Sequence, residues 1–207
     1  MPFSIPFPIR VRTEVKLAAI DRPFEYLVIA EAALTGYLRG HLLQAGSLNP
    51  VSPIRHVCLS SQAEVECDVR PVFDAIVGYS WPSQIRFAVD PMPAPATSAR
   101  TSMPTGVQRL TAGLFTQAFL AYYESIVAST VARFGPDAEA WPEVLKFARM
   151  TRNAVGHGGK LEIRNPRATA SWRGLSFDST SNGQALMYQH LAGGDLILLM
   201  LDADDAV

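Results

Sequence analysis

The sequence predicts a mainly α protein, an antiparallel four-helix bundle with a small β-ribbon after its third main helix. Three observations predict it: the 207-residue chain is 48% hydrophobic, apolar residues recur at helical spacing in four segments, and short or proline-rich connections separate these segments. Because this length and apolar content suffice for one buried core, residues 1–207 are expected to form a single domain.

The first half of the chain is predicted to contribute one bundle helix, Pro23–Gly46. Its apolar residues recur at helical spacing and a glycine ends it. Residues 1–22 form an N-terminal arm, within which the proline-broken stretch from Ile5 to Ala19 is either an edge strand or part of the arm.

Between this helix and the second half lie two further segments. Ser60–Val77 is expected to be helical until Pro71 ends or kinks it. Residues 78–104 form a proline-rich loop insertion, since five prolines lie between Trp81 and Pro104 and no period is sustained.

The second half carries the most regular pattern. Thr105–Phe134 has apolar residues on two neighbouring faces, which predicts a central and mostly buried helix. Gly135 and Pro136 break it, and Asp137 is placed to cap a third helix that turns Trp141 and Leu145 inward.

The chain after the third helix is predicted to close the fold. Residues 160–180 alternate polar and apolar side chains around a turn, as in an antiparallel β-ribbon. A short last helix, Asp195–Asp202, buries leucines, and the acidic end with Asp202, Asp204 and Asp205 is expected to be a solvated tail.

Charge is unevenly distributed along the chain. The formal net charge of −1 and pI near 6.4 argue against bulk electrostatic coating of nucleic acid. Between Lys146 and Arg173, however, the chain contains seven basic residues and one acid, Glu162, so the local formal charge is 7 − 1 = +6. The predominance of arginine suits phosphate contacts, and coding bias explains that predominance equally well, but coding bias does not explain the clustering. The candidate RNA-binding residues in this basic window are Lys146, Arg149, Lys160, Arg164, Arg167 and Arg173.

A polar string, RMTRNAVGHGG from Arg149 to Gly159, ends the third predicted helix. Asn153 and His157 are four residues apart and so share a face, while Arg152 lies on the neighbouring stripe. A purely structural interpretation is available, because histidine suits the carbonyl end of a helix and glycines commonly end one.

The segment Arg152, Asn153, Ala154, Val155, Gly156, His157 resembles the R-N-x-x-x-H signature of the HEPN superfamily, in which a histidine follows an arginine by four to six residues. The resemblance covers roughly Pro23–Gly46 and Thr105–Asp202. It implies a metal-independent endoribonuclease acting as a homodimer, with the two motifs facing each other across the interface. By the same resemblance, Arg152 would stabilise charge on the scissile phosphate, His157 would transfer a proton, and Asn153 would orient one of them. No cofactor and no metal ion are implied.

The ribonuclease that the resemblance implies is expected to be a toxin or defence enzyme, with a neutralising antitoxin as its partner. Two other functions stay open beside it. One is a catalytically silent HEPN-fold module that binds RNA or a nucleotide, or only dimerises. The other, weaker one is a hydrolase using Ser60 or Ser61, for which no G-x-S-x-G elbow is visible. Trp172 is expected to pack within the ribbon more readily than to stack on a base.

The compartment and the cysteines complete the expectations. The N-terminus has no basic flank before its apolar residues, and no apolar run reaches the length of a membrane span, so a cytoplasmic protein without membrane partners is expected. His56, Cys58 and Cys67 match no common zinc spacing, which favours reduced, mostly buried thiols.

Overall fold

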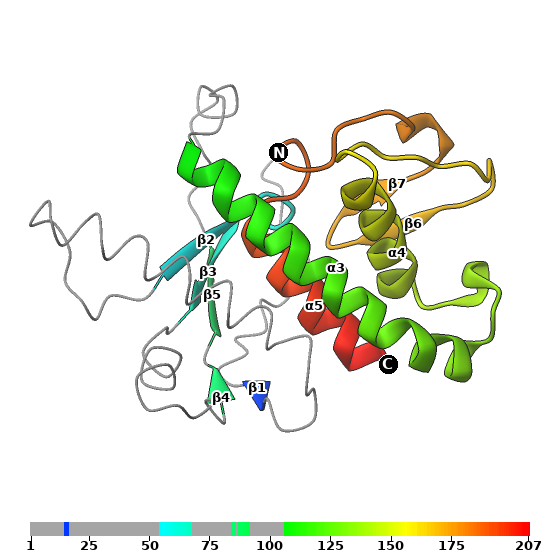
Figure 1. The fold of residues 1–207 in the computed structure, drawn as a ribbon, viewed down its shortest axis with the longest axis horizontal. Coiled ribbons are helices and arrows are strands. Elements are labelled where there is room, and N and C mark those ends of the chain that lie inside the picture. The colour runs from blue at the N-terminus through cyan, green and yellow to red at the C-terminus, as the bar shows by residue number, and fades with distance from the viewer. Residues whose placement is uncertain (1–14, 17–53, 68–83, 86, 92–105) are drawn as a thin grey trace, which may run out of the picture.

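The computed structural model describes residues 15–16, 54–67, 84–85, 87–91 and 106–207, and within them the fold is mixed α/β (Figure 1). Three α-helices combine with a three-stranded antiparallel sheet, a two-stranded hairpin and a short strand pair. The predicted four-helix bundle is therefore wrong. The predicted helix Pro23–Gly46 lies outside the described residues.

The sheet has the strand order β2-β3-β5, with β2 spanning Ile54–Cys58, β3 Ala63–Cys67 and β5 Phe87–Pro91. Both pairs of neighbouring strands, β2–β3 and β3–β5, are antiparallel. The helix predicted from Ser60 onward is wrong across β3, because the sequence AEVEC alternates: Ala63 and Val65 are buried while Glu64 and Glu66 are partly exposed. Period-two burial outweighed the helix propensity of alanine and glutamate.

The proline-rich insertion also contains strands, which corrects its prediction as a loop. β5 lies within it, and Pro91 is tolerated because β5 is an edge strand of the sheet. A two-residue strand, β4 (Gln84–Ile85), pairs antiparallel with β1 (Val15–Lys16). Val15–Lys16 lies within the stretch from Ile5 to Ala19 that was predicted as an edge strand or as part of the arm. This pairing shows that these two residues form a short strand.

Two helices follow the predicted positions closely. α3 spans Gly106–Phe134, so the predicted central helix is confirmed, and its Phe115, Phe119 and Tyr122 side chains are completely or almost completely buried. α4 spans Glu143–Gly156. Asp137 caps the preceding 3-10 turn η3 (Ala138–Ala140), where its carboxylate accepts a hydrogen bond from the Glu139 amide at 3.1 Å, and it does not cap α4 itself.

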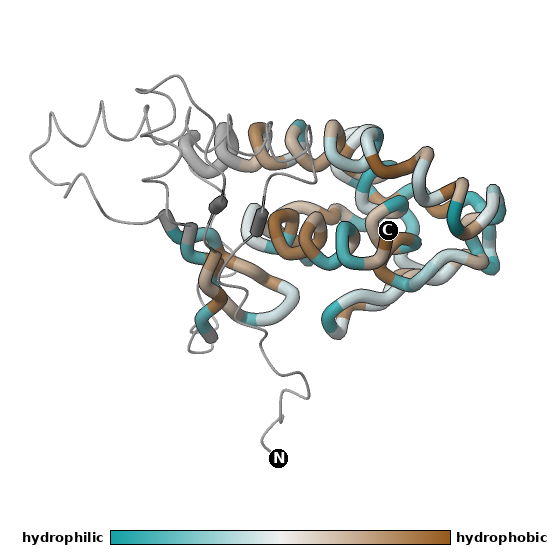
Figure 2. Tube along the Cα trace, turned by 90° about the horizontal axis from the view of Figure 1, so that it is seen from below, coloured by the Kyte–Doolittle hydropathy of each residue, from teal (hydrophilic) through white to brown (hydrophobic). Residues whose placement is uncertain are grey.

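The C-terminal helix α5, Gly193–Ala206, lies at the centre of the fold and contacts α3, α4, β2 and β3. Figures 1 and 2 show it running beside α3, with apolar residues concentrated in its inner part. All residues from 194 to 201 are buried. A helix apolar on every side is buried on every side.

The predicted solvated tail is wrong in conformation, because Asp202, Asp204 and Asp205 all belong to α5; of the three, Asp205 is exposed and Asp202 and Asp204 are partly buried. Asp202 accepts hydrogen bonds from Trp172 and Arg173. Burial, and next the neighbouring Asp204 carboxylate, raise the pKa of Tyr122. The helix extends beyond the predicted end because carboxylates on its last turns have partners on other elements.

The predicted ribbon is confirmed at its outer end, where β6 (Ala170–Trp172) pairs antiparallel with β7 (Leu175–Phe177). The two turn residues, Arg173 and Gly174, have φ of 45° and 81°, as a type I′ hairpin turn requires. Trp172 is buried, with its ring centroid 5.5 Å from that of Phe147 on α4. The packing role expected for Trp172 is what its burial supports.

A buried carboxylate, Asp195, joins α5 to the sheet. It accepts hydrogen bonds from the amides of Leu59, Ser60 and Ala192 at 2.8, 3.1 and 2.7 Å and from the Ser60 hydroxyl at 2.5 Å. Burial raises the pKa of the Asp195 carboxyl, while these donors act in the opposite direction. The β2–β3 turn is thereby fixed to the first turn of α5.

Next to Asp195, the backbone of α5 approaches β2 too closely for any side chain. A Cβ atom on Gly194 would lie 2.7 Å from the Cys58 sulfur, 2.7 Å from the His56 carbonyl oxygen and 2.8 Å from the Val57 carbonyl oxygen. Two of these neighbours are backbone atoms, which cannot rotate away. Position 194 therefore requires glycine.

We predict that Gly194→Ala lowers the free energy of unfolding by about 1–3 kcal/mol, because the added methyl group overpacks the α5–β2 contact. Gly113→Ala is the matched control, since Gly113 is exposed within α3 and nothing lies within 4 Å of its added Cβ atom. That control is expected to stabilise by about 0.5–1 kcal/mol through helix propensity. Urea unfolding of both variants measures the difference, and equal effects of the two changes would contradict the close contact.

Candidate functional site

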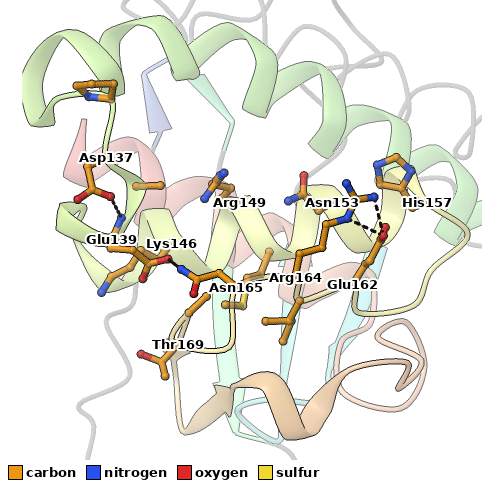
Figure 3. Close-up of a pocket in the computed structure, with 15 residues that line it drawn as sticks. Asp137, Glu139, Lys146, Arg149, Asn153, His157, Glu162, Arg164, Asn165 and Thr169 are labelled. Atoms are coloured by element: carbon orange, nitrogen blue, oxygen red, sulfur yellow. Dashed lines mark hydrogen bonds and ion pairs between the residues drawn. The ribbon is translucent and has the colours of Figure 1, made fainter.

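A polar groove with a volume of about 560 Å³ lies between α4, the 3-10 turn and the segment that leads to β6 (Figure 3). Charged, amide and hydroxyl side chains line most of it, with a few apolar residues between them. The lining residues are Pro136, Asp137, Ala138, Glu139, Lys146, Arg149, Met150, Asn153, His157, Glu162, Ile163, Arg164, Asn165, Ala168 and Thr169.

One stripe of α4 forms the helical wall of the groove. Arg149, Asn153 and His157 are spaced by four residues and follow one another along the helix in Figure 3. The opposite side of α4 is buried through Phe147, Ala148 and Thr151. The amphipathic pattern of α4 therefore directs this polar stripe to the groove.

The end of α4 exposes His157. The amides of His157 and Gly159 both donate to the Ala154 carbonyl oxygen, at 3.2 and 2.7 Å, and Gly158 and Gly159 have φ of 85° and 80°. This is a glycine-terminated helix end, as the structural interpretation of the motif predicted. The same geometry leaves the imidazole exposed on the groove, so the structural and functional interpretations are compatible.

Arg152 does not line the groove, because Glu124 of α3 holds it on the neighbouring stripe. The Arg152 Nε and Nη2 atoms donate to the Glu124 Oε1 atom at 2.8 and 2.6 Å. Its remaining nitrogen, Nη1, donates to the Asn153 Oδ1 atom at 3.4 Å. The motif arginine therefore lies outside the groove, whereas Asn153 and His157 line it.

The basic window from Lys146 to Arg173 is largely neutralised by acids from elsewhere in the fold. Glu143, Glu124, Glu162 and Asp202 form ion pairs with four of its seven basic residues, which are Lys146, Arg152, Arg164 and Arg173. Three of these four acids lie outside the window. Within the described chain, no ion pair involves the remaining Arg149, Lys160 or Arg167. The local balance of +6 thus overstates the positive field.

The groove itself is balanced in formal charge. Lys146, Arg149 and Arg164 line it together with three acids, which are Asp137, Glu139 and Glu162. Hydrogen bonding and charge interaction with Arg164 hold the pKa of Glu162 below its usual value, and His157 contributes to the same shift. The acids at the 3-10 turn were missed from the sequence, since nothing local indicates that this turn borders the groove beside Lys146 and Asn165.

The predicted RNA-binding residues divide between the groove and other surfaces. Lys146, Arg149 and Arg164 line it, whereas Lys160, Arg167 and Arg173 do not. Arg173 instead forms a two-nitrogen contact with Asp202, through Nε at 2.8 Å and Nη2 at 3.2 Å. The Asp202 carboxylate also accepts from the Trp172 indole at 2.9 Å. This Trp172–Arg173–Asp202 cluster joins the hairpin to α5.

The other candidate groups lie in the sheet or in the turn between β2 and β3. Cys58 is a buried free thiol whose pKa burial raises, and Ser60 donates to Asp195. The Cys67 side chain lies outside what the structure describes. Among the described residues, no group of three or more metal-ligating side chains comes together, and no helix is long and apolar enough to cross a membrane.

Comparison of the chain with protein-family profiles, with curated proteins and with solved structures finds no match.

Arg173→Ala is expected to lower the free energy of unfolding by about 1–2 kcal/mol, because it removes a charge-assisted contact that joins the hairpin to α5. The matched control is Arg167→Ala, in which an exposed arginine without an ion pair among the described residues is removed. This control should change stability by no more than about 0.5 kcal/mol. Urea unfolding measures both changes in the free energy of unfolding. If Arg173→Ala did not lower the stability, the structural role of the cluster would be contradicted.

Proposed function

We propose that this protein binds RNA along the groove beside α4 and cleaves it without a metal ion, as a cytoplasmic endoribonuclease of the HEPN type. The observation that carries the proposal is the line of Arg149, Asn153 and His157 on the groove wall. A guanidinium, an amide and an imidazole on one open surface supply charge, hydrogen bonds and proton transfer. The proposal rests on these side chains and does not require a four-helix bundle.

The chemistry needs only the substrate's own hydroxyl as nucleophile. The RNA 2′ oxygen attacks the neighbouring phosphorus, its proton passes to a base, and the bond from phosphorus to the 5′ oxygen breaks. The leaving oxygen takes a proton, and the products are a 2′,3′-cyclic phosphate and a 5′-hydroxyl end. Imidazoles titrate near neutrality and serve either proton step.

Each chain supplies one exposed histidine to the groove, whereas the reaction needs one group to accept a proton and one to donate it. A homodimer with its two grooves facing each other would bring two copies of His157 to one phosphate. A neutralising antitoxin partner belongs to the same proposal, since it would cover such a surface in a toxin.

Arg149 is the guanidinium best placed to contact a phosphate in the groove. It lines the groove and has no ion-pair partner among the described residues. Arg152, to which the family resemblance assigns charge stabilisation, is already paired with Glu124. In this proposal Arg149 binds the phosphate. Arg152 lies outside the groove and acts on it through its contact with Asn153.

The Arg152–Glu124 pair also favours a second candidate, a module that binds RNA but does not cleave it. A motif arginine neutralised by a glutamate contributes less to a charge-dense transition state than a free one does. The same groove would then bind phosphate without chemistry.

We expect purified protein to cleave mixed RNA in excess chelator and to leave 2′,3′-cyclic phosphate ends. His157→Ala is expected to lower the rate by about 10² to 10⁴, the usual contribution of general acid–base catalysis. Gel analysis and end-group chemistry measure both. Circular dichroism and sedimentation of each variant serve as controls, since His157 also stands at the end of α4.

The alternative module is distinguished by the same samples. RNA binding without cleavage, or cleavage at wild-type rate by His157→Ala, would reject the ribonuclease and leave the binding module. Cleavage that chelator abolishes would reject the metal-independent mechanism.

RNA affinity is expected to fall with salt, but with a shallow slope, because four of the seven basic residues of the window are already paired. Arg149→Ala should reduce that slope by about one counterion, while Arg173→Ala should leave it unchanged. Fluorescence anisotropy at several salt concentrations measures the slopes. Equal losses from the two substitutions would show that the whole window binds RNA and that the groove is not its centre.

A further inference from the structure

We infer that Glu124 is a positioning residue which, through Arg152, fixes the Asn153 amide so that its N–H donors face the groove and bind a phosphate oxygen beside His157. This inference deepens the proposed function and rests on it. It assigns a role to a residue of α3, 28 residues before Arg152, and specifies the chemistry of the ligand atom at Asn153.

The first step is the fixation of Arg152. Two of its nitrogens donate to one oxygen of Glu124, at 2.8 and 2.6 Å, so the guanidinium plane has a defined orientation across the α3–α4 contact. The Arg152 and Glu124 side chains are 35% and 54% exposed, so solvent screens the pair and its contribution to stability is small. Its consequence is geometric.

The second step is the orientation of Asn153. Arginine offers only donors, so the atom of Asn153 that faces the Arg152 Nη1 atom at 3.4 Å must be the amide oxygen. The amide nitrogen then points away from Arg152. Because Asn153 lines the groove between Arg149 and His157, its two N–H donors are available there.

The third step identifies the ligand atom. An N–H pair beside a guanidinium and an imidazole recognises an acceptor, and the most strongly accepting atom in RNA is a phosphate oxygen. If the amide turned over, its oxygen would face the phosphate and repel it. Glu124 therefore determines, from outside the groove, whether Asn153 binds the anion.

The inference makes a prediction opposite in sign to simple electrostatics. Removing the Glu124 charge makes the region more positive, which by charge alone would strengthen RNA binding. The inference predicts instead that RNA binding weakens, because the Asn153 amide loses its fixed orientation. The matched control is Glu139→Ala, which removes the same charge from the groove rim but contacts neither Arg152 nor Asn153; Glu139 accepts only from Asn165, at 3.3 Å, among the contacts of its side chain that the structure describes.

The test is a double-mutant cycle between Glu124 and Asn153. The affinity of a short 2′-O-methyl oligoribonucleotide, which cannot be cleaved, is measured by fluorescence anisotropy at 0.15 M salt, roughly physiological ionic strength. The variants are Glu124→Ala, Asn153→Ala, the double variant and Glu139→Ala. Glu124→Ala is expected to weaken binding about tenfold in the wild-type background and less than about twofold in the Asn153→Ala background. Glu139→Ala is expected to strengthen binding, because it removes a negative charge from the groove rim without disturbing Arg152 or Asn153.

A conservative variant separates orientation from folding. Glu124→Gln keeps an acceptor oxygen for Arg152, so it should retain more affinity than Glu124→Ala, and circular dichroism should show wild-type helicity for both. Asn153→Asp, which presents only acceptors, should weaken binding at least as much as Asn153→Ala. Stronger binding by Glu124→Ala, or equal effects in both backgrounds, would overturn the inference.

The cleavage assay distinguishes this inference from the proposed function. Coupling between Glu124 and Asn153 in a protein that never cleaves RNA would refute the ribonuclease and support the positioning role. Cleavage by the wild type without coupling between Glu124 and Asn153 would support the ribonuclease and refute the positioning role. If the wild type does not bind the oligonucleotide at all, both proposals fail.

Discussion

The position of α5 depends on one buried carboxylate. Asp195 takes four hydrogen bonds, three of them from backbone amides, and so ties the first turn of α5 to the β2–β3 turn. Gly194 permits this approach because its backbone lies against the carbonyls of β2. Without that junction, a helix with apolar residues on every side would have no fixed orientation between the sheet and the other two helices. The elements that pack on α5 are thereby placed relative to the β2–β3 turn.

The groove is one of the consequences. α4 rests on α5 through its buried side, and the hairpin rests on both, since Trp172 packs on Phe147 and donates to Asp202. This packing holds the chain between α4 and β6 against the polar stripe of α4. The groove is therefore a by-product of how the C-terminal half packs, and its walls come from three separate segments.

Charge pairing then determines which cations act in the groove. Arg152 and Arg173 are each directed away by an acid on another helix, and Lys146 is held by Glu143. Arg149 has no such acid among the described residues, so it is the cation of α4 that a ligand meets without displacing a partner. A dense run of basic residues in a sequence thus does not measure the field of the folded surface, because acids distant in the chain lie next to it.

The sequence by itself determined those features that depend on neighbouring residues. Helical spacing located α3, α4 and α5, the alternation of polar and apolar residues indicated a ribbon within residues 160–180, and Gly158 and Gly159 marked the end of α4 beside His157, because helical hydrogen bonds and side-chain alternation are local. Only the tertiary structure decided that residues 63–67 form the central strand of a sheet, that α5 continues beyond Asp202 to Ala206, and that Arg152 lies outside the groove. The physical reason is distance along the chain: Glu124 lies 28 residues before Arg152, and Asp202 lies 29 residues after Arg173. No local pattern carries the pairing of residues that only folding brings together.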